Sequence, residues 1–250
     1  FTYIAEEVYK NIGDKEWAKN LYKKAEGKAE DYFGNAVTKG TLISTASTVK
    51  SFRKLAESVC ENLGDKEWAK KVYKKAEGKA EDYSDFSDLA YSIQENLGDK
   101  EWAKNLYKKA EGKAKDSDDF YSLADRIHES LGDKEWVKKI YKKWEEMAED
   151  FSNFYNIADH ILENLGDKEW VKKVYKKAED KAENCDDFSN LANSLCQEMS
   201  DKEWAKKVYK KAEAKAEEYE LTSLADTIYE NLDDKELAKK GKEVVTTGDD

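Results

Sequence analysis

A short motif, Asp-Lys-Glu-Trp, recurs along this chain at a nearly constant pitch. Its tryptophans stand at 17, 68, 102, 136, 170 and 204, and from 68 onward successive positions differ by 34 residues. Leu237 takes the same slot in the last segment. A pitch of this length is typical of stacked two-helix units, each of which buries its apolar face only against its neighbours. The sequence therefore predicts an all-α solenoid of about seven antiparallel helix hairpins.

The segment 85–116 shows how one hairpin is expected to form. Its first half places apolar residues at helical spacing on one face, namely Phe86, Leu89, Ala90, Ile93 and Leu97. Gly98 is expected to end this helix, because glycine reaches the left-handed region cheaply, and Asp99 is a good N-cap for the next. The second helix is predicted to bury Trp102, Ala103, Leu106, Tyr107, Ala110 and Ala114. Its lysines, among them Lys104 and Lys109, are expected to face water.

The unit resembles the tetratricopeptide repeat. The resemblance rests on the first-helix pattern Phe86, Leu89, Ala90 and Ile93, the turn Gly98-Asp99, and the second-helix pattern Ala103, Tyr107 and Ala110. The turn is one residue shorter than in that family, and the chain has no proline to end each repeat. The resemblance implies a right-handed superhelix whose inner surface is lined mainly by the first helix of each pair.

We expect a single array over residues 1–250. Its parts are repeat 1 at 1–32, an insertion at 33–50, repeats 2–6 at 51–218, a capping repeat at 219–246 and a tail at 247–250. The insertion is interpreted as a binding element, as an ordinary surface loop, or as an extra helical half-unit. Phe1 falls in the leading slot of a repeat, which indicates either a piece of a longer polypeptide or a processed N-terminus.

Composition narrows the partners. The net charge of -11 argues against nucleic acid, which needs a basic footprint. No apolar run is long enough to insert in a membrane. The three cysteines lack metal spacing and favour a reducing compartment such as the cytoplasm. Neither His128 nor His160 has the companions that a metal needs. We therefore expect no cofactor, no metal and no enzymatic activity.

Three polar slots of the first helix vary strongly between repeats, whereas the apolar slots hardly change. They lie one, five and eight residues after the leading aromatic, so they form one stripe of the helix. Tyrosine recurs there, and tyrosine is enriched in interfaces. The alternative is a water-facing surface that has drifted. The predicted partner-binding residues are Arg53, Glu57, Tyr91, Gln94, Tyr121, Asp125, His128, Tyr155, Asp159, Asn193, Asp226 and Tyr229.

A second candidate patch comprises Trp144, Met147 and Phe151. Trp144 replaces the alanine that other repeats carry in this slot. Local repacking around the larger ring is one interpretation. An exposed patch that docks another chain is the other.

These patterns predict a protein-interaction scaffold that binds a protein or peptide segment, with a basic segment favoured by the acids of the middle slot. The alternative is a structural protein that self-associates, polymerises or bridges subunits. An open end of the array that exposes Phe1, Ile4 and Val8 would favour this second reading.

Overall fold

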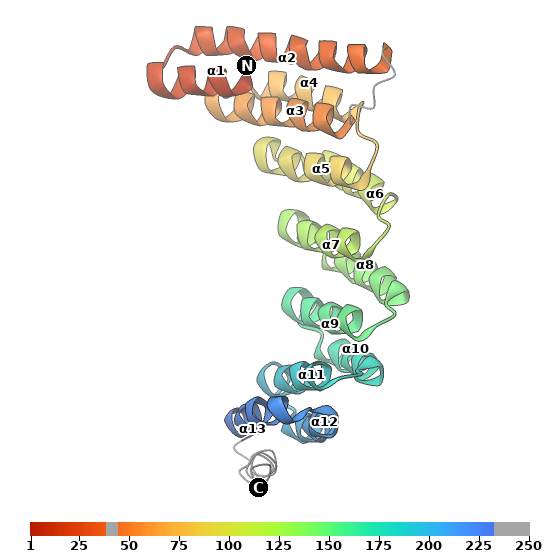
Figure 1. Ribbon diagram of the computed structural model, residues 1–250. Helices are drawn as coiled ribbons and strands as arrows, with labels where there is room; N and C mark the ends of the chain where they lie inside the picture. The colour runs from red at the N-terminus through yellow and green to blue at the C-terminus, as the bar shows by residue number, and fades with distance from the viewer. Residues whose placement is uncertain (39–44, 233–250) are drawn as a thin grey trace. The chain divides into compact units, whose positions relative to one another are not determined.

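The computed structural model describes residues 1–38 and 45–232, with side chains described for 1–30 and 48–232. Every regular element over these residues is a helix, and no strand occurs among them. Successive helices pack as hairpins against hairpins (Figure 1), so the prediction of an all-α solenoid-type array is confirmed. The chain divides into two units, Phe1–Ile140 and Tyr141–Asp250.

Unit 1 holds three complete hairpins and the helix that follows them. Their elements are α1 (Thr2–Glu7) with the π-helical turn η1 (Val8–Ile12), α2 (Lys15–Thr38), α3 (Thr45–Ser58) with η2 (Val59–Leu63), α4 (Lys66–Glu77), α5 (Tyr83–Leu97), α6 (Lys100–Glu111) and α7 (Ser117–Leu131). The helix α8 (Lys134–Met147) begins in this unit. α1 pairs with α2, α3 with α4 and α5 with α6, and the first helices α3, α5 and α7 pack side by side.

Unit 2 repeats the arrangement. Its elements are the last part of α8, then α9 (Phe151–Leu165), α10 (Lys168–Lys181), α11 (Cys185–Gln197), α12 (Lys202–Lys215) and α13 (Glu218–Leu232). α9 pairs with α10 and α11 with α12. The first helices α9, α11 and α13 pack in sequence, as α3, α5 and α7 do in unit 1.

A two-residue turn closes each hairpin, as the sequence predicts. The glycine before the motif has a positive φ, between 64° and 74° at the five positions that carry it. The following aspartate accepts a hydrogen bond from the backbone N–H of the motif tryptophan, at 2.9–3.1 Å, in all six hairpins. In the 200-region turn Ser200 takes the glycine position at φ 55°. Each turn thus ends one helix and caps the next within two residues.

Each hairpin buries a second-helix tyrosine whose hydroxyl has a polar partner. The bonds within unit 1 are Tyr22–Asn62, Tyr73–Ser92 and Tyr107–Ser130; those within unit 2 are Tyr141–Asn164, Tyr175–Asp159 and Tyr209–Asn193. The rings are fully buried. Since a buried hydroxyl without a partner is costly, these pairs fix both the depth and the register of neighbouring helices.

A repeated contact, which we call the tryptophan joint, connects successive second helices. The indole N–H of the motif tryptophan donates to a glutamate of the preceding second helix at 2.8–3.0 Å, and in four joints the lysine seven residues after the tryptophan donates to the same carboxylate. The joints are Trp68–Glu26–Lys75, Trp102–Glu77–Lys109, Trp136–Glu111, Trp170–Glu145–Lys177 and Trp204–Glu179–Lys211.

This contact corrects the expectation that the second-helix lysines only face water. Lys109 binds Glu77, and Lys104 binds the capping Asp133 of the next turn at 3.2 Å. The lysines are half-exposed, so their aliphatic stems lie along the protein while the ammonium groups reach a neighbouring repeat.

The two irregular regions of the sequence are described only in part. The backbone of the insertion at 33–50 continues α2 to Thr38 and begins α3 at Thr45, while residues 39–44 lie outside the described part. Its binding role stays a prediction. Most of the expected capping repeat at 219–246 and all of the tail at 247–250 fall in the undescribed range 233–250.

Candidate functional site: the first-helix faces

In unit 1 the predicted binding residues lie on α3, α5 and α7, but they do not form one free surface. Tyr91 and Tyr121 are 40% and 37% exposed, whereas Gln94, Asp125 and His128 are half-buried. Helix contacts place α5 between α3 and α7. The two tyrosines are thus the accessible part of the stripe in this unit.

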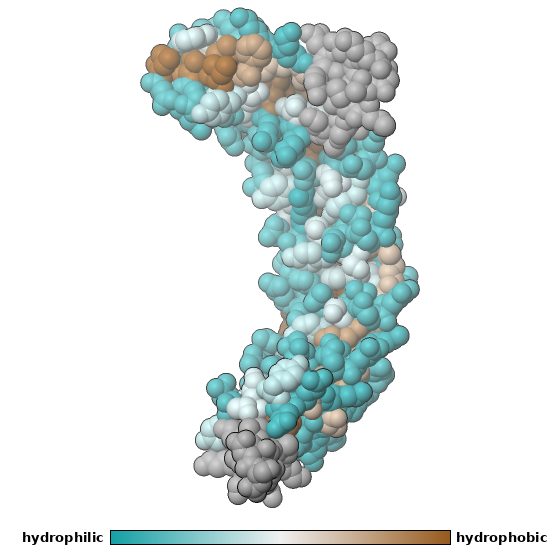
Figure 2. All heavy atoms as spheres, in the orientation of Figure 1, coloured by the Kyte–Doolittle hydropathy of each residue, from teal (hydrophilic) through white to brown (hydrophobic). Residues whose placement is uncertain are grey.

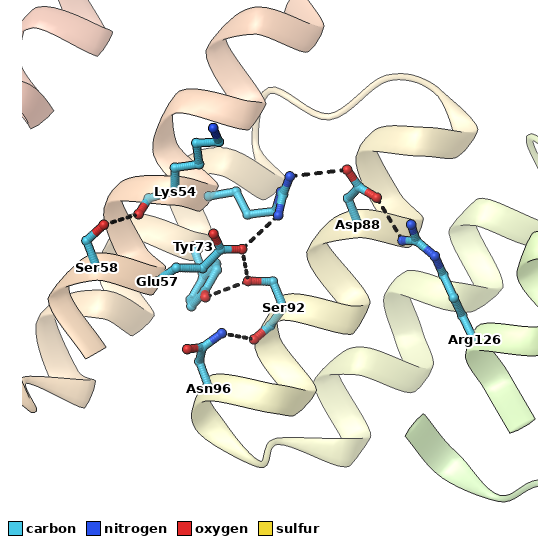
Figure 3. A network of polar contacts seen from close by, with 9 residues as sticks. Lys54, Glu57, Ser58, Tyr73, Asp88, Ser92, Asn96 and Arg126 are labelled. Carbon is cyan, nitrogen blue, oxygen red and sulfur yellow. Dashed lines mark hydrogen bonds and ion pairs between the residues drawn. The ribbon is translucent and has the colours of Figure 1, made fainter. Parts of the chain in front are cut away.

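The remaining two predicted residues of unit 1 belong to a polar network between helices (Figure 3). Arg53 binds Glu57 one turn along α3, at 2.7 Å, and reaches Asp88 on α5 at 3.4 Å. The Ser92 hydroxyl of α5 donates to Glu57 at 2.7 Å and also meets the hydroxyl of the buried Tyr73. Glu57 therefore connects two hairpins, and its charge is balanced by an arginine of its own helix.

A second arginine occupies the next position along the array. Arg126 of α7 binds Asp88 at 2.8 Å and lies over the ring of Tyr91 at 5.8 Å from its centroid. Arg53 and Arg126 are the only arginines in the chain. Both lie on first helices of unit 1, and both place a guanidinium against the acids and tyrosine of the stripe.

Unit 2 has a cavity in the corresponding position, between α9 and α11. This α9–α11 cavity has a volume of ≈ 570 Å³ and is lined by Tyr155, Asp159, Leu162, Glu163, Ser194, Gln197 and Glu198. Three of these residues are acids and none is basic. Two of them, Tyr155 and Asp159, are predicted binding residues, which the fold brings together on one face of α9.

The cavity wall is held by contacts from three helices. Tyr155 stacks on Phe151, with ring centroids 5.4 Å apart, and its hydroxyl meets that of Ser194 at 2.7 Å. Asp159 accepts a hydrogen bond of 2.5 Å from the hydroxyl of Tyr175 on α10. These side chains are therefore ordered before any ligand arrives, which reduces the entropy lost on binding.

Burial sets the electrostatics of this wall. Desolvation raises the pKa of the Asp159 carboxyl above its ordinary value, although the hydrogen bond from Tyr175 opposes the rise. Desolvation likewise raises the pKa of the Tyr155 hydroxyl. A carboxylate that is poorly solvated gains more from an incoming cation than an exposed one does.

One slot that the sequence analysis did not single out matters as much as the predicted three. It lies six residues after the leading aromatic and contains Ser58, Ser92, Arg126, His160 and Ser194. Ser58 donates to Glu6, Ser92 donates to Glu57, and Arg126 binds Asp88, so this slot faces the preceding first helix. The alternation between serine and a larger basic or aromatic side chain was the signal available in the sequence.

The other predicted residues of unit 2 are placed as follows. Asn193 lies between α12 and α13, where it accepts from the Tyr209 hydroxyl at 2.5 Å and from Asn231 at 3.0 Å. Asp226 and Tyr229 are exposed on α13. Asn193 thus supports the hairpin packing, whereas Tyr229 is accessible.

The second candidate patch is not assembled as an exposed surface. Trp144 and Phe151 are buried, and only Met147 is exposed. The Trp144 ring packs against Tyr141 and against His160 of α9, with centroid distances of 6.2 and 6.0 Å. The larger ring is accommodated by this packing, which corrects the docking interpretation.

Two further searches bear on the site. Over the described residues, no three or more His, Cys, Asp or Glu side chains are grouped so that they could hold a metal ion. The described helices include none with the length and hydropathy needed to cross a membrane.

Comparison with known proteins gives little. No family model and no curated protein matches the chain. Among solved structures, the chain is similar to one titled "Circular tandem repeat protein with novel repeat topology and enhanced subunit contact surfaces", with 17% identity and a TM-score of 0.24. The match covers 98% of this chain and 56% of that one. At this TM-score the likeness adds nothing to the fold established by the helix contacts.

Proposed function

We propose that this chain is a protein-interaction scaffold, and that the α9–α11 cavity receives a basic side chain, specifically arginine, from a partner segment. The observation that carries the proposal is the acidic lining of a ≈ 570 Å³ cavity without any basic residue in its wall. That volume lies within the usual range of ligand sites, about 300–1,000 Å³. The Tyr155 ring and Leu162 provide apolar surface for the stem of a long side chain.

The chain's own arginines support the choice of guanidinium. Arg126 lies between α5 and α7 with a tyrosine ring on one side and a carboxylate on the other. Ser194 is its equivalent between α9 and α11. Because serine is short, the space is left open and is available to a side chain from outside. A planar guanidinium also pairs with carboxylates and stacks on aromatic rings better than an ammonium group does.

The proposal includes the finer parts of the sequence interpretation. We infer that the array is of the tetratricopeptide type, with a right-handed superhelix and the first helices on its inner surface. We also infer an interaction role without catalysis. Elemental analysis that found a stoichiometric metal in the purified protein would count against the second inference.

The experiment uses N-acetyl-arginine amide as the probe, with the lysine analogue beside it. We expect titration of the isotope-labelled chain to shift backbone amide signals of α9 and α11, with larger shifts for the arginine compound. Asp159→Asn should weaken binding by about tenfold or more, the usual cost of losing a hydrogen bond to a charged group. Glu169→Gln removes the same charge from an exposed position on α10 and is the matched control.

Shifts that are spread evenly over the acidic surface would contradict the proposal, because a net charge of -11 attracts any cation weakly. Equal loss of binding in Asp159→Asn and Glu169→Gln would contradict it in the same way.

A structural role is the second candidate. The observation that favours it is an exposed apolar face at the N-terminal hairpin, which includes Phe1 and Ile4. Val8, which was also expected to be exposed there, is instead buried at 5% exposure, because it lies in the π-helical turn that folds back toward α2.

A further inference from the structure

The N-terminal hairpin exposes several large apolar side chains together. Phe1 is 54% exposed, Ile4 50%, Ile12 62% and Trp17 48%. Figure 2 shows hydrophobic residues gathered over α1 and α2, toward the end at which the two helices are joined. A contiguous apolar surface of this kind usually marks an interaction site.

The same slots are buried in the hairpins that follow. Within unit 1 the slot of Phe1 is filled by Phe52, Phe86 and Phe120, which are 1–8% exposed. The slot of Ile4 is filled by Leu55, Leu89 and Leu123, which are at most 1% exposed. These later hairpins each have a hairpin packed before them. The N-terminal face therefore has the composition of an inter-hairpin surface rather than that of a polar cap.

The preceding second helix presents a three-residue socket to each tryptophan. Trp102 receives the Lys70 ammonium over its ring at 5.9 Å, meets the Tyr73 ring edge-on at 6.4 Å, and donates to Glu77 at 2.9 Å. Lys70, Tyr73 and Glu77 stand at positions i, i+3 and i+7, so they share one face of α4. Trp136 meets Lys104 and Glu111 of α6 in the same way.

Two charged contacts complete the joint. The socket lysine also binds the aspartate that caps the next helix, at 3.3 Å for Lys70–Asp99 and 3.2 Å for Lys104–Asp133. The socket glutamate binds the lysine seven residues after the tryptophan, at 2.6 Å for Lys109–Glu77. Both sides of the joint are thus matched in charge as well as in shape.

The N-terminal hairpin carries its whole half of this joint. Trp17 is half-exposed, Asp14 caps α2 through the backbone N–H of Trp17 at 2.9 Å, and Lys24 stands exposed seven residues after Trp17. We propose that this N-terminal face docks a partner helical hairpin whose packed helix presents Lys-x-x-Tyr-x-x-x-Glu, with its glutamate accepting the indole N–H of Trp17.

A second copy of this chain is the less favoured occupant. In the described part of the chain, the socket glutamates at 26, 77, 111, 145 and 179 already accept a tryptophan. One further socket, Lys206, Tyr209 and Glu213 on α12, precedes a slot that holds Leu237 instead of tryptophan. α13 packs against α12 on the chain's own side of this helix.

The test places a known socket beside the face within the full chain. A copy of residues 86–119 is fused directly before Phe1, which keeps the 34-residue pitch. The copied Glu111 then stands 25 residues before Trp17, as Glu111 stands before Trp136. Amide and indole hydrogen exchange is followed by NMR, and Trp17→Phe identifies the Trp17 indole signal.

We expect the added segment to become helical and the Trp17 indole N–H to exchange at least about tenfold more slowly than in the natural chain. The matched control is the same fusion with the copied Glu111 changed to alanine. It should return most of the lost exchange rate, because the packing remains while the acceptor is gone.

Three outcomes would overturn the proposal. The first is a helical fusion whose Trp17 indole exchanges as fast as in the natural chain. The second is an added segment that stays unfolded, since the hairpins inside the chain fold by packing on a face of this kind. The third is a natural chain that dimerises in sedimentation at high concentration with Trp17 protected, because a second copy would then cover the face. The result is independent of the α9–α11 cavity, which belongs to unit 2.

Discussion

At the scale of the residue, one backbone conformation closes every hairpin, and one hairpin achieves it at a cost. Five turns use glycine at positive φ, whereas Ser200 adopts φ 55° with a side chain. The left-handed region costs a residue with a Cβ about 1–2 kcal/mol. A single residue type therefore sets how firmly each turn is held.

Ser200→Gly should raise the free energy of unfolding by about 1 kcal/mol, because glycine adopts this conformation without the steric cost. Urea denaturation followed by circular dichroism measures the change. Gly166→Ser, in the other complete turn of unit 2, is the reciprocal variant and should lower stability by a similar amount. Equal stability of Ser200→Gly and the natural chain would show that the turn is not strained.

Asp159 is the residue at which stability and binding oppose each other. Burial raises its pKa, so the native state binds the proton more tightly than the unfolded chain does, and the ionised carboxylate destabilises the fold above that raised pKa. Asp159→Asn should therefore stabilise the protein at neutral pH, since Asn193 holds the equivalent tyrosine hydroxyl in the next hairpin. The gain should shrink as the pH falls toward 3.8. Thermal melts across this range, with a gain that does not change with pH, would contradict the assignment.

At the scale of the element, the tryptophan joint connects successive second helices. Glu179 shows it most fully, because its buried carboxylate accepts from Trp204, Lys211 and Lys176, and the lysine bonds help to lower its pKa. Its ionised form is thus favoured in the folded state, and removing it leaves an indole N–H without its acceptor.

Glu179→Ala should lower the free energy of unfolding by about 1–3 kcal/mol, the cost of deleting one partner of a charged hydrogen-bond group. The matched control is Glu213→Ala, in the same slot of α12, because the following tryptophan slot holds Leu237. Chemical denaturation compares the two. Equal losses would mean that the indole bond contributes nothing.

The helix caps give this array a predictable acid sensitivity. Hydrogen bonds from the Trp136 backbone and from Lys104 lower the pKa of Asp133 below its usual 3.8. Its contribution is fully present above the ordinary value and is lost as the pH falls through the lowered pKa. Asp133→Ala should cost about 1 kcal/mol at neutral pH, as N-cap deletions do, and less near pH 2. Denaturation at both pH values measures the difference.

Sequence reasoning reached the hairpins because their signals are local. A tryptophan slot, a glycine and a capping aspartate within five residues predict each turn, and the structure has it there. The contacts between hairpins were harder to predict. Lys109 and Glu77 are 32 residues apart, and each alone looks like a solvated surface charge. The cavity was missed because it depends on the small size of Ser194, which carries no chemical signature of its own.

At the scale of the whole molecule, a net charge of -11 and pI ≈ 5.0 fit a scaffold that attracts basic segments. Charge of one sign speeds encounter more than it strengthens the final complex, so association should slow as salt increases. The specific step is left to one cavity, in which the chain lacks the arginine that it supplies to itself between α5 and α7.

The most direct test of this account fills the cavity from within. Ser194→Arg should place a guanidinium between α9 and α11, as Arg126 does between α5 and α7, and a thermal melt checks that the variant folds. Calorimetric titration with a peptide that contains a single arginine should then show binding to the natural chain and a loss of about tenfold or more in Ser194→Arg. Unchanged affinity in a folded Ser194→Arg protein would contradict the central claim that this cavity is where the partner binds.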